Sequence, residues 1–167
     1  MDTTVQNIEV SPEISSSINQ QSERVETLEE YIERHQTYWK NIVEGLSKKL
    51  SKLPDLIELE SSVIVERQYC LEYYYNLLNK ISKISKEYKV NYAKQFNYYK
   101  TGSNIRYGSD NSINAQIAAD LSDYTYKIEL LNGLAKYMQE TLRNLDTVSY
   151  SIKNRIEIEK LVQSYGK

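Results

Sequence analysis

The sequence has few of the residues that make turns, disulfides and metal sites. Among its 167 residues there are five glycines, two prolines, one cysteine and one histidine. So few turn-forming residues exclude a fold of many short strands and favour long helices. The single cysteine, Cys70, cannot form a disulfide within the chain, which is typical of a protein from a reducing cytoplasm. We therefore expect an all-α protein.

Groupings of residues that would perform catalysis are also missing. His35 and Cys70 lie in different predicted helices, and no carboxylates show the spacing of metal ligands. The segment around Gly102 and Gly108 lacks the Gly-Lys-Ser/Thr ending of a phosphate-binding loop, and there is no nucleophile elbow. We expect no enzyme activity, no metal and no cofactor, and we interpret His35, Trp39 and Cys70 as packing residues.

Long apolar runs are absent too. None approaches the roughly 18 residues of a membrane span, and the N-terminus has no basic stretch followed by an apolar one, as a signal peptide would. The sequence predicts a soluble, cytoplasmic protein that does not bind membranes.

The formal net charge is −2, but the charged residues are unevenly distributed along the chain. Residues 1–66 carry 13 acidic and 6 basic side chains, whereas residues 79–107 carry six lysines and one arginine against Glu87 alone. The chain is therefore dipolar, and its basic middle could attract a polyanion that the average charge would repel.

The N-terminal third divides into a tail and a helix. Residues 1–21 are rich in Ser, Asn, Gln and Thr, which predicts a flexible polar tail. From about Ser22 apolar residues recur in steps of three and four, which predicts an acidic helical arm over 22–54. Pro54 ends this helix because proline lacks a backbone donor.

A second helix is predicted from Asp55, a plausible N-cap, to Tyr99. A Gly-, Ser- and Asn-rich loop follows and completes a segment over 55–112.

The segment 113–167 has the most regular pattern. Its apolar residues alternate in four-three spacing, as in a helix that keeps one seam against a partner helix. We expect one continuous helix over 113–163, about 75 Å long, although Asn132-Gly133 could instead turn it into two antiparallel helices. The second helix can cover part of this seam, and the rest predicts a homo-oligomer. The residues expected to hold copies together are Leu121, Tyr124, Ile128, Leu131, Met138, Leu142, Leu145, Ile152 and Ile156.

The basic stretch combines lysines with tyrosines. Lysines recur every three residues from Lys80 to Lys89, so they sweep around half of the helix surface. Cationic groups that follow phosphates, with aromatic rings that stack on bases, are typical of single-strand binding without sequence preference. The alternative is a solvated helix face with the tyrosines in the core. The expected DNA contacts are Lys83, Lys86, Lys89, Lys94, Tyr98, Tyr99, Lys100 and Arg106.

Short motifs through the C-terminal two thirds carry a resemblance to a known family. They are the aromatic turn at 97–102, the Asp-containing helix entry at 118–121, and the stretches 127–131 and 151–157. With these motifs in consistent order, residues 60–167 resemble the UvsY family of recombination mediators from T4-like bacteriophages. The acidic arm has no obvious counterpart in that family.

The resemblance implies a function in DNA recombination, repair and replication. It implies helical protomers in a ring of six or seven subunits, located in the cytoplasm of the infected bacterial host. Its implied partners are single-stranded DNA, a RecA-like recombinase of the UvsX type and the phage single-strand-binding protein. The alternative that the residues leave open is a structural coiled-coil or interaction protein that binds no nucleic acid.

Overall fold

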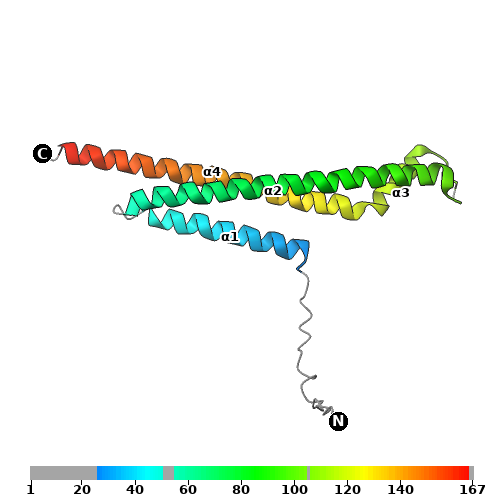
Figure 1. Ribbon diagram of the computed structural model, residues 1–167, viewed down its shortest axis with the longest axis horizontal. Helices are drawn as coiled ribbons and strands as arrows, with labels where there is room; N and C mark the ends of the chain where they lie inside the picture. The colour runs from blue at the N-terminus through cyan, green and yellow to red at the C-terminus, as the bar shows by residue number, and fades with distance from the viewer. Residues whose placement is uncertain (1–25, 51–54, 105, 166–167) are drawn as a thin grey trace, which may run out of the picture.

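The chain folds into an elongated helical rod (Figure 1). A computed structural model describes residues 26–50, 55–104 and 106–165. Within these residues there are four α-helices, one π-helical turn and no strand, so the all-α prediction is confirmed. The predicted tail over 1–21 lies outside the described residues. The elements are α1 (Leu28–Lys49), α2 (Leu56–Asn97), η2 (Tyr98–Gly102), α3 (Asp110–Asp120) and α4 (Ser122–Tyr165).

The two longest helices, α2 and α4, run antiparallel, and α1 lies beside the first half of α2 (Figure 1). The rod therefore has three helices at one end. At the other end α2 pairs with α3 and the start of α4. On α2 the buried side is formed by Leu56, Leu59, Val63, Cys70 and Leu77, whose spacing of three, four and seven residues keeps one stripe facing inward.

The first helix begins later than the pattern indicates. We expected it from about Ser22, but residues 26 and 27 are not helical and α1 begins at Leu28. Thr27 sets this boundary through a capping box: its hydroxyl accepts from the Glu30 amide at 3.2 Å, and its own amide donates to Glu30 Oε2 at 3.0 Å. Asp55 precedes α2 as predicted, but its side chain does not cap the helix, because its backbone is already helical.

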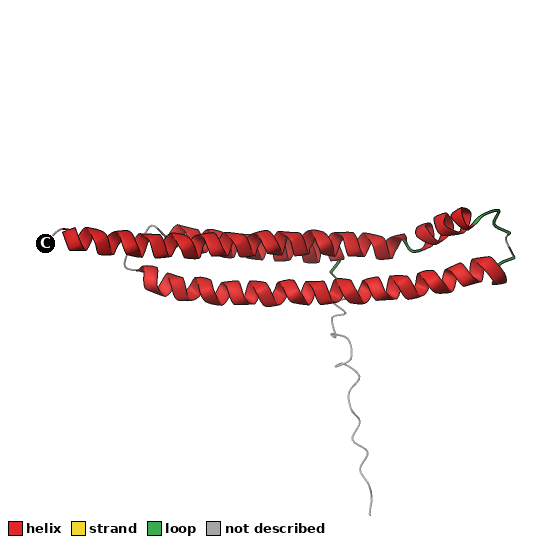
Figure 2. Ribbon diagram, turned by 90° about the horizontal axis from the view of Figure 1, so that it is seen from above, coloured by secondary structure: helices red, strands yellow, loops and turns green. Residues whose placement is uncertain are grey.

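The predicted continuous helix over 113–163 is wrong at one point. The chain breaks at Leu121, where φ is −105° and ψ is 15°, and α3 does not continue the axis of α4 (Figure 2). Turning α3 allows Ile113, Ile117 and Leu121 to pack against aromatic side chains at the end of α2, while Ser122 and Asp123 are residues that favour a new helix start. Gly133 lies inside α4 without a break, so the predicted continuity across it is confirmed.

The apolar seam of α4 is buried within a single chain. The prediction that other copies of the chain must cover part of it is therefore corrected. Antiparallel folding of α2 and the cover of α1 together occupy the side of α4 that we expected to face a second molecule. Leu131, Met138, Leu145 and Ile152 belong to the buried core, with Leu142 and Ile156 packed against it. Leu121 and Tyr124 belong to a second cluster, and Ile128 is half-buried.

Candidate nucleic-acid interface

The four predicted lysines of α2 are all exposed. Three of them, Lys83, Lys86 and Lys94, line a shallow groove of about 470 Å³, whereas Lys89 does not. Lys83 and Lys94 are eleven residues apart, which is about 16 Å along a helix. Among the described residues none of the four has an ion-pair partner, so their charge is available to a ligand. The groove is lined by Lys83, Lys86, Glu87, Val90, Asn91 and Lys94.

The groove has a rigid floor because α2 is tied to α4 beneath it. Asn91 donates from Nδ2 to the Tyr124 hydroxyl at 2.9 Å, and Tyr124 packs against the cluster of Ile113, Ile117 and Leu121. Lysines on such a helix are held at fixed spacing, although their long side chains can adjust to a ligand.

Lys80, the first lysine of the stretch, is used inside the chain. Its Nζ donates to the Tyr31 hydroxyl at 3.3 Å and lies 5.2 Å from the centre of the Tyr31 ring. This cation therefore joins α2 to α1 and does not belong to the groove.

The predicted cations near the end of the rod differ from those of the groove. Lys100, in η2, lies 3.7 Å from Asp110 and 5.3 Å from the centre of the Phe96 ring, so part of its charge is already satisfied. Arg106 is exposed in the following loop. Both line a second hollow of about 520 Å³, which also contains hydroxyls of Thr101 and Ser109.

Most of the tyrosines among these lysines are structural. Tyr88, Tyr92, Tyr99 and Tyr107 pack with Phe96 against Ile113, Ile117 and Leu121. Tyr92 donates to Asn114 at 2.8 Å, and Tyr99 donates to Asp120 at 2.5 Å. The bond to the Asp120 carboxylate raises the pKa of Tyr99 to about 12. Tyr99, which we predicted to stack on bases, is half-buried and engaged by Asp120 and the cluster.

Tyr98 is the predicted aromatic that stays available, with 57% of its surface exposed. Both tyrosines lie in η2 with their ring centres 5.4 Å apart, but only Tyr99 packs against the cluster. The Tyr98 ring lies against Gly102, where an added Cβ would be 3.4 Å from Cδ2 of the ring. The sequence motif marked this turn, but nothing in it distinguished the two tyrosines.

The residues interpreted as packing residues lie away from the groove. The His35 ring stacks on Tyr73 with ring centres 4.6 Å apart, and the tilted Tyr31 ring lies 4.4 Å away. Cys70 and Trp39 are buried in the core. In the described part of the chain no group of three or more His, Cys, Asp or Glu side chains could hold a metal ion.

Within residues 26–50, 55–104 and 106–165 every helix is too short or too polar to cross a bilayer.

Comparison with known proteins gives no relative for this chain: no family model, curated protein or solved structure matches it.

Proposed function

We propose that this protein is a non-catalytic single-stranded DNA-binding protein that acts as a recombination mediator. The observation that carries the proposal is the groove on α2, where Lys83, Lys86 and Lys94 converge without ion-pair partners among the described residues. Exposed Tyr98 lies farther along the same end of the rod and supplies an aromatic surface.

The groove suits a flexible strand better than a duplex. Its cations can neutralise successive phosphates, while an exposed aromatic ring stacks on any unpaired base, which gives about 1–3 kcal/mol per base. Neither contact reads base edges, so the expected binding is independent of sequence. With three lysines engaged, the logarithm of affinity should fall with the logarithm of salt with a slope of about −2, since each neutralised phosphate contributes about −0.7.

The mediator part of the proposal depends on the resemblance to the UvsY family. It predicts that the chain helps a UvsX-type recombinase load onto DNA covered by the phage single-strand-binding protein. The resemblance also predicts a ring of six or seven subunits and a location in an infected host, and both stay predictions.

The direct test is fluorescence anisotropy with a labelled oligonucleotide at low salt. The variant Lys83→Glu/Lys86→Glu/Lys94→Glu should lose nearly all binding. The matched control Lys127→Glu/Lys136→Glu/Lys153→Glu changes the net charge equally at exposed positions on α4 and should keep most of it. Equal losses in the two variants would mean that only net charge matters and would contradict the groove as the site.

The mediator activity is tested separately, by recombinase loading on strands covered with single-strand-binding protein. If the wild-type chain binds DNA but never accelerates loading, the mediator part fails while the binding site stands.

The second candidate, a structural or interaction protein, is favoured by the rod shape itself (Figure 1). It predicts that wild-type protein leaves the oligonucleotide unbound at low salt.

A further inference from the structure

A mainly apolar hollow adjoins the lysine groove on the side of α1. It has a volume of about 540 Å³ and lies where the start of α1 meets α2 and α4. It shares Lys83 and Glu87 with the groove, so the two form one continuous depression along α2. The residues that line this apolar hollow are Glu26, Thr27, Leu28, Tyr31, Lys80, Lys83, Ile84, Glu87 and Leu131.

The lining of the apolar hollow is suited to an apolar side chain. Leu28 and Ile84 are half-buried, so part of each stays accessible, and Leu131 of the core also lines the hollow. Apolar surface in a concave site gains free energy when another apolar group covers it. An occupant should therefore bring apolar side chains.

The charge around the apolar hollow and the groove is mainly positive. The three lysines of the groove and Lys80 supply four cations. Of the two acidic side chains in the lining, Glu26 is already paired with Arg34 at 2.7 Å, which leaves Glu87 to offset the lysines. An occupant should therefore also carry negative charge.

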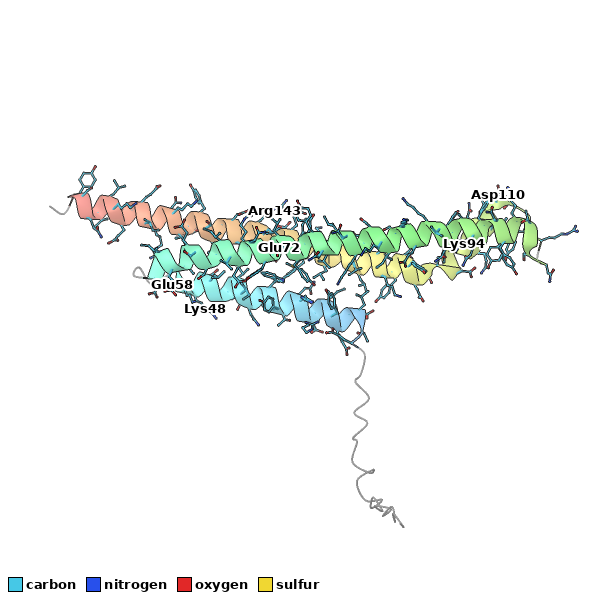
Figure 3. The ribbon with its side chains drawn as sticks, in the orientation of Figure 1. Lys48, Glu58, Glu72, Lys94, Asp110 and Arg143 are labelled. Carbon is cyan, nitrogen blue, oxygen red and sulfur yellow. The ribbon has the colours of Figure 1, made fainter. Side chains whose placement is uncertain are left out.

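The chain itself enters the apolar hollow from the N-terminal side. Residues 1–25 join the described part of the chain at Glu26, which lines the hollow. From there α1 runs away from the groove to Lys48, whereas Lys94 lies on α2 beyond the start of α1 (Figure 3). A segment attached at Glu26 is thus beside both sites, and such a tether raises its effective concentration to about the millimolar range.

One segment before Glu26 combines apolar and acidic side chains. Residues 1–23 contain four acidic and no basic side chains. Among them, residues 7–14 read Asn-Ile-Glu-Val-Ser-Pro-Glu-Ile. Its isoleucines and valine suit the apolar hollow, and its two glutamates suit the lysines of the groove.

The connection to this segment is long enough. Eleven residues, 15–25, join it to Glu26, and they can span at most about 36–40 Å. The lysines of the groove extend over only about 16 Å of α2. The segment lies outside residues 60–167, so the family resemblance implies nothing about it.

We infer that residues 7–14 dock across the apolar hollow and the lysine groove of their own chain. Their apolar side chains cover Leu28 and Ile84, and their two glutamates pair with lysines of the groove. The docked segment competes with a polyanion for these lysines, so it lowers the affinity of the free protein for DNA. This consequence rests on the proposed function, whereas the contact itself does not.

The contact is tested without DNA, by zero-length crosslinking of the full chain with a carbodiimide. This reagent joins a carboxylate to an amine only where the two are in contact. Wild-type protein should therefore give peptides in which Glu9 or Glu13 is linked to Lys83, Lys86 or Lys94. A mixture of isotopically labelled and unlabelled chains shows whether the link lies within one chain. Absence of these links, or links between chains only, would overturn the inference.

The consequence is tested by fluorescence anisotropy of the full chain with an oligonucleotide at low salt. Glu9→Gln/Glu13→Gln should raise the affinity by about three- to tenfold, because it removes two exposed ion pairs of the docked segment. Ile8→Ser/Val10→Ser should also raise it, since the apolar contact is lost while the charge is kept. The control Asp2→Asn/Glu23→Gln changes the charge of the same tail equally and should bind like the wild type.

Equal rises in the two charge variants would mean that only the net charge of the tail matters, and this result would overturn the docked segment. Unchanged affinity in Glu9→Gln/Glu13→Gln, with a wild type that binds DNA, would do the same. A wild type that gives the expected crosslinks while every variant leaves the oligonucleotide unbound would contradict the proposed function and support the contact. The two failures are therefore distinguishable.

Discussion

The hydroxyl of Tyr99 donates a hydrogen bond of 2.5 Å to the carboxylate of Asp120. This bond joins the end of the basic helix to the residue before the break between α3 and α4. Asp120 also accepts from Gln116 at 2.8 Å. The pair holds α3 against the aromatic cluster, and it explains why one of two adjacent tyrosines is structural and the other exposed.

The two tyrosines should therefore respond differently to substitution. Tyr98→Ala should weaken oligonucleotide binding by about tenfold, because one stacking contact contributes about 1–3 kcal/mol. Tyr99→Phe keeps the ring and loses the bond to Asp120, so DNA affinity should stay near wild type while amides of α3 exchange hydrogen faster. Anisotropy and hydrogen exchange measure the two effects, and a larger loss of affinity for Tyr99→Phe would reverse the assignment.

Leu145 should act as a core residue of the single chain. It is completely buried, so Leu145→Ala should lower the free energy of unfolding by about 2–5 kcal/mol. Leu161→Ala, near the C-terminal end of the same helix, should change the stability of the monomer by less than about 0.5 kcal/mol. Urea denaturation compares them. A Leu145 variant that dissociates into folded monomers without loss of stability would restore the seam as an interface between chains.

Gly133 should be replaceable with a gain in stability. It lies in the interior of α4, and a Cβ added there would meet no atom within 4 Å. Gly133→Ala should stabilise the protein by about 0.5–1 kcal/mol, because alanine loses less backbone entropy in a helix. The expected result is a raised midpoint of thermal unfolding. Gly45→Ala in α1 should behave in the same way, because a Cβ added at Gly45 also meets no atom within 4 Å.

His35 should make stability depend on pH. Burial lowers its pKa below the ordinary value of 6.5, and the nearby Arg34 cation lowers it further. The unfolded chain therefore binds a proton more readily, so the stability is fully present above about pH 6.5 and falls as the pH drops below it. Denaturation at pH 7.5 and 5.5 should show the loss. His35→Gln should remove most of the difference, and an unchanged pH dependence in that variant would assign it to other groups.

Cys70 should be unreactive in the native protein. Burial raises the pKa of its thiol to about 12, so almost no thiolate exists near neutral pH. A colorimetric thiol reagent should label the native chain only as fast as it unfolds and should label it at once in guanidinium. Fast labelling of the native chain would show that the packing between α2 and α4 opens around Cys70.

The helices themselves follow from neighbouring residues in the chain. Apolar spacing predicted α1, α2 and the C-terminal helix, and the lysine spacing predicted an exposed basic stretch, because helical period and side-chain direction are local properties. The start of α1 was missed because the apolar stripe continues upstream of the boundary, at Val25, whereas the capping box of Thr27 and Glu30 starts the helix at Leu28.

Only the tertiary structure decided which surface covers the apolar seam of α4. The seam of α4 could face a second copy or another part of its own chain, and the folding back of α2 with the cover of α1 selected the latter. The break at Leu121 and the packing of Tyr99 against the aromatic cluster arose in the same way. Each depends on contacts between residues far apart in the sequence, whose packing determines which of several locally equivalent side chains becomes buried.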